Sequence, residues 1–336
     1  MKICVIGAGA IGGLMAAKFA AAGQEVTVLD QGPHLAAIRE KGLKLIWEDG
    51  SEIVADNLTA TDNLAEVGPQ DLVILALKAH YLEQVARKLD SVMGPETMIV
   101  TVQNGIPWWY FHKHGGPHEG QSLETLDPTG ILGKHIEADR IVGCVVYPAA
   151  AVPEPGVIRH VEGDRFPIGE LDGRETPRVQ QLHDALVEAG FRSRVLDDIR
   201  SEIWLKAWGN LSFNPISALT HATLVEICQF PDTRRLAATM MAESQAIAEK
   251  LGVTFRHTIE KRIAGAEGVG AHKTSMLQDV EAGRSLEIEA LMGAVLEMGR
   301  LTETPAPAIE TVYACVKLLN KVMLLQGAGV RVGEAA

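Results

Sequence analysis

The 336-residue chain has no uninterrupted apolar run of membrane-spanning length, few cysteines and no excess of basic residues. Without a long apolar run, it is not expected to bind or cross a membrane through a helix. Its formal net charge of −12 opposes nonspecific binding to nucleic acid or anionic lipid, because both require clustered Lys and Arg. Neither a metal-type pair nor an obvious disulfide framework is expected from its four widely spaced cysteines, Cys4, Cys144, Cys228 and Cys315.

The few cysteines and the first residues both point to the cytoplasm. All four thiols are expected to be small buried side chains in a reducing compartment. A strand-like run ending in glycines follows Lys2 directly, so the pattern of a signal peptide is missing. We therefore expect a cytoplasmic protein.

The hydrophobic pattern changes along the chain and predicts two domains. Residues 1–196 alternate helical stretches with runs rich in β-branched residues, which predicts an α/β half whose first strands are parallel. From residue 197 to about 330, apolar residues recur at three- and four-residue spacing, which predicts an all-helical half. A ligand is expected in a cleft between the halves. The last residues, "VRVGEAA", are expected to form a frayed tail.

A glycine-rich segment, "GAGAIGG", lies between the strand-like run "KICVI" and a helical stretch. In a dinucleotide site Gly7 allows the tight turn, Gly9 the close approach of pyrophosphate, and Gly12 the packing of helix on strand. Ala10 and Ile11 begin the helix whose N-terminus faces the anion. The alternative is a strand-to-helix turn without a ligand, which leaves the glycine spacing as a coincidence.

The next strand-like run, "EVTVLD", ends in Asp30. An acidic residue at this place can accept hydrogen bonds from the adenosine ribose. Together with the glycine segment, it predicts that residues 1–196 form a Rossmann-type NAD(P)-binding domain.

Two further strand ends carry polar residues. "VILALKAHY" places Lys78 after one strand, and "VTVQNGIPWW" places Asn104 after another. Because ligands of open α/β sheets gather at the carboxyl ends of strands, Lys78 could meet a phosphate or carboxylate and Asn104 a ribose or substrate. A solvated lysine and an Asx turn before glycine are equally consistent with the positions alone.

The helical half contains a polar stripe in an apolar helix. Lys206, Asn210 and Asn214 are four residues apart, so they share one helical face, and a tryptophan lies two residues to either side of Lys206. Pro215 is expected to disrupt the helix just after Asn214. The alternative interpretation is an ordinary solvent face.

Ser275 and Glu287 follow in "KTSMLQDVEAGRSLEIEALMG" and are further candidates. Ser275 with Gln278 also fits a helix capping box, and Glu287 could be an exposed helix residue. Taken alone, capping is the expected role of this serine.

In this order, "GAGAIG", "LKA", "QNG", "IRSEIWLKAWGNLSFNPISAL" and "SMLQD…EIE" cover nearly the whole chain, and their combination resembles the ketopantoate reductase family (2-dehydropantoate 2-reductases). The resemblance implies that Lys206 is the catalytic general acid. It implies that Glu287 holds the substrate hydroxyl and orients the site. The chemistry agrees, because an ammonium group can stabilise the charge that develops on a ketone oxygen and supply the proton.

The same resemblance implies further roles. Asn210, Asn214 and Ser275 correspond to substrate-binding positions. Asn104 corresponds to the residue between nicotinamide and substrate, and Lys78 to a mobile lysine near the cofactor and the substrate carboxylate. The implied activity is NAD(P)H-dependent reduction of a branched 2-oxo acid, with ketopantoate as the default substrate, in pantothenate biosynthesis. Homodimerisation through the helical half is an option that the sequence leaves open.

Two other functions compete with this one. A D-2-hydroxyacid dehydrogenase on the same scaffold would act on aromatic or branched substrates such as mandelate-like acids. A non-catalytic dinucleotide-sensing protein would have kept the glycine segment alone, although the presence of both Lys206 and Glu287 argues against it.

The sequence departs from the family after the second strand. Members that use NADPH carry a basic residue there, whereas this chain has Asp30 and Gln31. A carboxylate suits the ribose hydroxyls of NADH and repels the 2′-phosphate of NADPH, so NADH is expected to be favoured.

A second departure is an insertion that begins "IPWWYFHKHGGPHEGQ". The aromatic residues at 108–111 either line the substrate pocket and admit a bulkier oxo acid or pack the inserted loop. His112, His114 and His118 have metal-ligand chemistry, but their glycine- and proline-rich surroundings favour a solvated loop, so no metal is expected.

Overall fold

The computed structural model describes residues 1–330, apart from the side chain of His80. These residues belong to two compact units, which we call unit 1 and unit 2. Unit 1 comprises Met1–Gln103 and Pro107–Ile199, and unit 2 comprises Asn104–Ile106 and the chain from Arg200 onward. The hydrophobic pattern of the sequence predicts the division after residue 196, with residues 104–106 in the first half. The expected frayed tail lies outside the described residues, apart from Val330.

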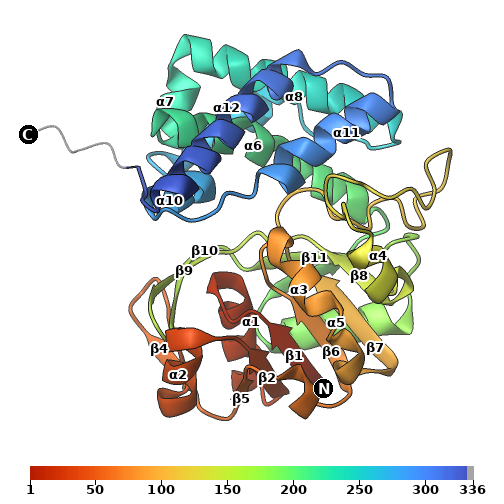
Figure 1. Cartoon of the computed structure of the whole chain (residues 1–336), viewed down its shortest axis with the longest axis vertical. Helices are drawn as coiled ribbons and strands as arrows, with labels where there is room; N and C mark the ends of the chain where they lie inside the picture. The colour runs from red at the N-terminus through yellow and green to blue at the C-terminus, as the bar shows by residue number, and fades with distance from the viewer. Residues whose placement is uncertain (331–336) are drawn as a thin grey trace, which may run out of the picture. The chain divides into compact units, whose positions relative to one another are not determined.

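Unit 1 is built on an eight-stranded sheet with the order β12-β11-β8-β7-β6-β1-β2-β5 (Figure 1). Neighbouring strands are parallel except β8 and β11, which are antiparallel. The central strands are continuous apolar runs because helices cover both faces of such a sheet. The strands are β1 (Lys2–Ile6), β2 (Glu25–Leu29), β5 (Thr59–Thr61), β6 (Gln70–Leu75), β7 (Met93–Thr101), β8 (Ile141–Cys144), β11 (Arg165–Glu170) and β12 (Arg192–Val195).

The helices of unit 1 connect these strands. They are α1 (Ala10–Ala21), α2 (Gly32–Lys41), α3 (Leu82–Ala86), α4 (Ile131–His135) and α5 (Pro177–Glu188). Short 3₁₀ turns lie at η1 (Leu64–Glu66), η2 (Ala79–Tyr81), η3 (Leu89–Val92) and η4 (Ala138–Arg140). The parallel strands and their crossover helices confirm the predicted α/β class with a Rossmann-type first domain.

A second, four-stranded sheet in unit 1 was not expected from the sequence. Its order is β4-β3-β10-β9, with β3 (Leu43–Ile46), β4 (Glu52–Ala55), β9 (Ala149–Glu154) and β10 (Val157–Glu162). The run "VIRHV" therefore belongs to this sheet and not to the main one. All four strands contact α1, which explains why α1 is apolar on nearly every side. The contact is close, because a Cβ on Gly13 would lie 2.5 Å from Cδ1 of Ile158.

The aromatic insertion is packed inside unit 1. Trp109, Tyr110 and Phe111 are at most 3% exposed, and the Trp109 indole donates a 3.0 Å hydrogen bond to Oγ1 of Thr101. Trp108 is half-buried. Packing of the inserted loop therefore accounts for three of the four aromatic residues, and the pocket-lining interpretation loses its support for those three.

The histidines of this insertion are half-buried, and the glycine and proline residues between them are exposed, as expected for a solvated loop. The rings of His114 and His118 lie 5.2 and 5.7 Å from the Phe111 ring, centroid to centroid. His112 Nε2 lies 3.1 Å from Oδ1 of Asp139. Buried apolar rings hold these side chains because Gly and Pro set the turns while Phe111 supplies the surface to pack on.

Unit 2 is helical. Its elements are α6 (Ile199–Thr220, whose first residue belongs to unit 1), α7 (Leu224–Gln229), α8 (Pro231–Lys250), α9 (Ile259–Val269), α10 (Ser275–Glu281), a π-helical turn η5 (Glu289–Gly293), α11 (Ala294–Leu301) and α12 (Pro307–Gln326). Trp204 and Trp208 of α6 are fully buried and form the centre of this core. Among residues 1–330, no helix is long and apolar enough to span a membrane.

The expected break at Pro215 was wrong, because α6 continues through it to Thr220. Pro215 cannot donate the helical hydrogen bond to residue 211, which costs about 3 kcal/mol in an exposed helix. Here the neighbouring Phe213 and Ile216 are buried, so packing of the helix in the core outweighs that local cost.

The cysteines also differ from expectation at one position. Cys4, Cys144 and Cys228 are buried as predicted, but Cys315 on α12 is exposed. Burial raises the pKa of the Cys4 thiol to about 12, so this side chain is an inert part of the β1 core.

Candidate functional site

The glycine loop lies at the carboxyl end of β1. Gly7 has φ +97°, and a Cβ on Gly12 would overlap the carbonyl oxygen of Gly7, so both positions require glycine. Gly9 precedes the first turn of α1, and a Cβ placed on it would meet no atom within 4 Å. The loop thus offers open space at the N-terminus of a buried helix, and its residues fit the pyrophosphate of a dinucleotide.

Side chains that follow β2 hold the middle of this loop. Asp30 Oδ2 accepts a 2.8 Å hydrogen bond from the Ala8 N–H, while Asp30 Oδ1 accepts one of 2.7 Å from Gln31. His34 Nε2 lies 2.8 Å from the Ala8 carbonyl oxygen. Asp30, the residue expected to bind ribose, therefore lies next to the loop and also stabilises it by a hydrogen bond.

Lys78 lies at the same edge of the sheet, because β6 pairs with β1 and Lys78 follows β6. The segment before it packs on the loop, since a Cβ on Gly7 would lie 2.8 Å from Cδ2 of Leu77. Gln103 fixes that segment by donating hydrogen bonds of 2.7 and 2.9 Å to the carbonyls of Leu75 and Leu77. The ends of β1, β2 and β6 thus bring the glycine loop, Asp30 and Lys78 to one edge of unit 1.

Unit 2 brings three of the predicted residues into hydrogen-bonding contact. Lys206 Nζ donates to Asn104 Oδ1 at 2.6 Å, and Asn104 Nδ2 donates to Glu287 Oε2 at 3.3 Å. All three side chains are half-buried. The amide places its oxygen against the cation and its N–H against the anion, so one side chain gives each charged group a hydrogen-bond partner.

The rest of the polar stripe continues along α6. Asn210 is half-buried and Asn214 is 7% exposed, so this face of the helix is not a solvent face. Both amides lie on the helical face of Lys206 because the spacing is four residues. They are available to a ligand that reaches Lys206.

Ser275 differs from the capping-box interpretation. The N-cap of α10 is Thr274, whose hydroxyl accepts a 3.2 Å hydrogen bond from the Leu277 N–H. Ser275 is the first helical residue and is exposed. Within the described chain, no hydrogen bond joins it to Asn104, Lys206 or Glu287. Thr274 does the capping because its backbone is extended, and Ser275 already has helical geometry.

A π-helical turn explains why Asn104 belongs to unit 2. The Ile106 N–H donates a 2.8 Å hydrogen bond to the carbonyl of Ala290, which lies in the π-helical turn η5. Gly105, at φ +87°, lets the two backbones meet, since a Cβ there would overlap the Ala290 oxygen. Wide turns of this kind are common at functional sites. The backbone contact at Gly105 and Ile106 holds the preceding Asn104 beside Lys206 and Glu287.

Sequence reasoning missed the residues of α12 that back Glu287. Asn320 Oδ1 accepts a 3.0 Å hydrogen bond from the N–H of Leu286. The Tyr313 hydroxyl donates to Glu289 Oε2 at 2.7 Å, and burial raises the pKa of Tyr313, which keeps this donor protonated. α12 therefore holds the backbone before Glu287 and the side chain after it. The sequence carried no distinctive signal for them, because α12 also contains Glu310, Thr311 and Lys321 among its apolar residues.

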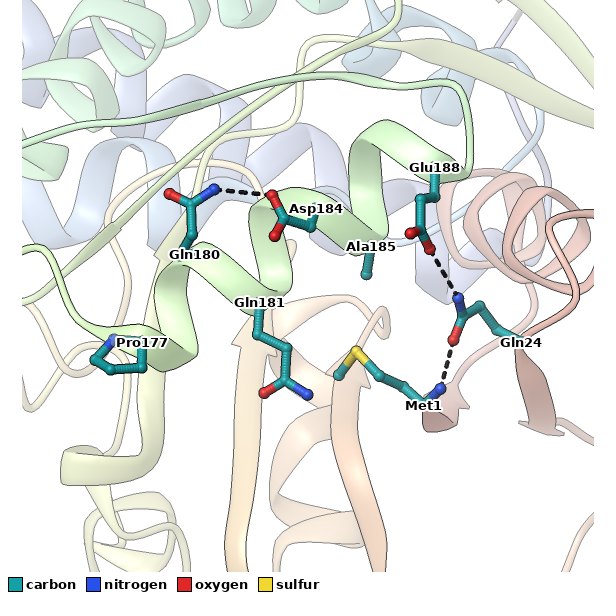
Figure 2. Close-up of a pocket in the computed structure, with 8 residues that line it drawn as sticks. All are labelled: Met1, Gln24, Pro177, Gln180, Gln181, Asp184, Ala185 and Glu188. Carbon is teal, nitrogen blue, oxygen red and sulfur yellow. Dashed lines mark hydrogen bonds between the residues drawn. The ribbon is translucent and has the colours of Figure 1, made fainter.

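One surface cavity of unit 1 lies away from these residues. It is lined by α5 side chains together with Met1 and Gln24, and the Met1 amino group donates to Oε1 of Gln24 at 2.5 Å (Figure 2). Met1 precedes β1 and the glycine loop follows it, so this cavity is at the amino edge of the sheet. Ligands of such sheets bind at the opposite edge.

Comparisons with known proteins identify a family. Residues 3–173 match "Ketopantoate reductase PanE/ApbA", and residues 198–320 match its C-terminal domain. A 2-dehydropantoate 2-reductase from Mesorhizobium japonicum is 53% identical over 320 residues, covering 95% of this chain and 98% of that protein.

Solved structures share the fold. The crystal structure of a candidate ketopantoate reductase from Ralstonia solanacearum MolK2 is 38% identical, with a TM-score of 0.92 over 97% of this chain and 99% of that one. A D-mandelate dehydrogenase solved with NADH and anilino(oxo)acetate is 23% identical, with a TM-score of 0.82 over 96% and 99%, and shows the fold alone.

Replacing Gly9 and replacing Gly12 by alanine are expected to have different effects. Gly9→Ala is expected to leave the melting temperature of the ligand-free protein unchanged, because its Cβ meets no atom and φ −64° suits alanine. It should weaken NADH binding about tenfold or more by occupying the space for pyrophosphate. Gly12→Ala should weaken binding and also destabilise the protein by about 1–3 kcal/mol, because its Cβ overlaps Gly7. Thermal melts and fluorescence titration test both, and wild-type affinity in Gly9→Ala would contradict the site.

Proposed function

Because the chain belongs to the ketopantoate reductase family and is an oxidoreductase, we propose that it reduces a branched 2-oxo acid, with 2-dehydropantoate as the default substrate, using NAD(P)H. The observation that carries this proposal is the hydrogen-bonded set of Lys206, Asn104 and Glu287. It puts a proton donor, an amide and a carboxylate within one half-buried cluster. The resemblance stated from the sequence is confirmed at the level of the family.

The residues of unit 2 are assigned the proton chemistry. The bound nicotinamide cofactor supplies the hydride. Lys206 Nζ stabilises the charge on the substrate oxygen and gives it a proton, and the 2.6 Å bond to Asn104 holds the ammonium in place beforehand. Glu287 accepts a hydrogen bond from Asn104, and its carboxylate is assigned to accept one from a substrate hydroxyl as well.

Asn210 and Asn214 are assigned to substrate binding. Each carries an amide that can both donate and accept, one and two helical turns beyond Lys206. A carboxylate or hydroxyl of a small oxo acid near Lys206 would find these donors without any change in the helix. Ser275 keeps the same assignment from the family resemblance and offers an exposed hydroxyl.

Replacing the proton donor tests the assignment. Lys206→Ala is expected to lower kcat about a hundredfold or more while the NADH dissociation constant stays nearly the same, because the cofactor loop belongs to unit 1. Lys261→Ala, at an exposed position of α9, is the matched control and should retain full activity.

A panel of ketopantoate, mandelate-like oxo acids and related substrates identifies the preferred acid. Turnover of none of them, with tight NADH binding, would favour the sensing function.

Asp30 supports a preference for NADH. Its carboxylate is bound to the Ala8 N–H of the glycine loop, and a 2′-phosphate placed beside it would face a like charge. The nearby Arg39 donates to Asp62 at 2.9 Å and to the Ala60 carbonyl at 3.0 Å. Arg39 would have to give up these hydrogen bonds to bind the 2′-phosphate of NADPH.

The expected preference for NADH is about ten- to a hundredfold in kcat/KM, from a penalty of about 1.5–3 kcal/mol. The double variant Asp30→Asn/Gln31→Arg should reverse much of it, because Asn keeps an acceptor for the Ala8 N–H and Arg adds a phosphate partner. Asp30→Asn alone separates the loss of charge from the gain of the guanidinium. Equal use of both cofactors by the wild type, measured as initial rates, would refute this role of Asp30.

The exposed face of α12 supports a homodimer. Cys315, Leu318, Val322 and Leu325 are exposed and recur at heptad spacing, and Leu318 and Leu325 are 62% and 77% exposed. Such a stripe can pack against the same stripe of a second copy. The opposite face of α12 packs in unit 2 through Val312, Val316 and Met323, so it is not available.

Leu318→Glu/Leu325→Glu is therefore expected to halve the mass measured by light scattering, because charges would be buried in the seam. Leu324→Glu is the control, since this residue is also exposed but lies on another side of the helix. A wild-type protein that is monomeric at micromolar concentration would rule out this dimer.

A further inference from the structure

Both ring nitrogens of His34 are engaged by the backbone of two separate elements. Nδ1 accepts a 3.0 Å hydrogen bond from the Gly156 N–H, in the turn between β9 and β10. Nε2 lies 2.8 Å from the carbonyl oxygen of Ala8 in the glycine loop. Since Nδ1 is the acceptor, Nε2 carries the proton and donates to Ala8. The contacts thus assign one neutral tautomer of the imidazole.

The donor on the far side of the ring is itself held firmly. The Gly156 carbonyl accepts a 2.9 Å hydrogen bond from the Lys44 N–H of β3. Gly156 has φ +79°, and a Cβ there would lie 2.9 Å from Cβ of Ala37, so the turn sits tightly against α2. The second sheet therefore fixes the orientation of the His34 ring.

The bond to Ala8 has a consequence for the next residue. The Ala8 carbonyl and the Gly9 N–H belong to one planar trans peptide and point in opposite directions. A side chain that holds the carbonyl therefore aims the Gly9 N–H. Asp30 holds the preceding peptide through the Ala8 N–H, so the two peptides before Gly9 are each held by a different side chain.

We propose that His34 is a positioning residue of the dinucleotide site, which aims the Gly9 N–H at the pyrophosphate and links the second sheet to the glycine loop. This inference rests on the proposed cofactor binding. The pyrophosphate is common to NADH and NADPH, so His34 affects affinity for both cofactors equally and has no part in choosing between them. It touches neither substrate nor proton donor, so its effect is confined to the cofactor dissociation constant.

The test compares variants that keep one of the two hydrogen bonds. Gln places an amide nitrogen near the position of Nε2 and can still donate to Ala8, whereas Asn reaches only as far as Nδ1. His34→Phe keeps a ring and loses both bonds. His160→Phe is the matched control, because His160 also lies 2.6 Å from a backbone carbonyl, that of Gly163, but in the second sheet and away from the loop.

We expect His34→Phe and His34→Asn to raise the dissociation constants of NADH and NADPH alike by about three- to tenfold, the scale of one lost hydrogen bond to a fixed backbone group. His34→Gln should stay within about twofold of the wild type, and kcat at saturating cofactor should not change. The affinity of His160→Phe should equal that of the wild type. Equal effects of Asn and Gln, or of the two Phe variants, would overturn the inference.

A second measurement needs no cofactor. The amide of Ala8 is bound to Asp30, and that of Gly13 donates to the Gly9 carbonyl at 2.6 Å. Hydrogen exchange at both should be faster in ligand-free His34→Phe than in His160→Phe, and unchanged exchange would overturn the inference. Failure of the wild type to bind either dinucleotide would instead refute the proposed function, and the exchange rates would still decide whether His34 orders the loop.

Discussion

One side-chain amide, that of Asn104, keeps a cation and an anion in place in the helical unit. Its oxygen accepts from Lys206 and its nitrogen donates to Glu287, so neither charge is left unpaired in a half-buried cluster. Each of these bonds uses one donor of the ammonium or one acceptor of the carboxylate, and the amide fixes where both groups lie. The rest of unit 2 serves this arrangement: α6 supplies the lysine, and α12 supports the irregular segment that carries the glutamate.

The glycine loop at the carboxyl edge of the unit 1 sheet is likewise held in place by contacts to its backbone. Glycines let the β1–α1 loop and the end of β6 approach each other, and side chains from the following element hold the peptides of that loop. The second sheet packs on α1 from the side opposite the main sheet, with Ile158 against Gly13. The helix whose N-terminus faces the anion is therefore enclosed on two sides, which explains why its sequence carries no amphipathic stripe.

Much of this architecture is predictable from local patterns. Runs rich in β-branched residues predicted β1, β2 and β6, and glycine spacing with Asp30 predicted the loop, because both signals depend on neighbours in the sequence. The second sheet was missed because β3 pairs with β10 more than a hundred residues later, and short strands carry little pattern. The effect of Pro215 was misjudged for a related reason, because packing partners far along the chain decide whether the helix continues. For Trp109 the sequence left pocket lining and loop packing open, and its burial favours loop packing. Lys206 and Glu287 were candidates from the sequence pattern, and their proposed roles come from the family resemblance, whereas the support from Asn320 needed coordinates.

The membership of Asn104–Ile106 in unit 2 bears on how this chain can be divided. The peptide backbone of these residues continues β7 of the first unit, yet their packing partners are Lys206, Glu287 and the Ala290 carbonyl. A single cut after residue 199 would therefore separate the helical fragment from an amide on which its polar cluster relies. A self-sufficient helical fragment would have to carry a grafted copy of this tripeptide, including the left-handed glycine that lets it dock. The polar cluster of the helical unit therefore includes residues that lie almost a hundred positions before the point in the sequence where that unit begins.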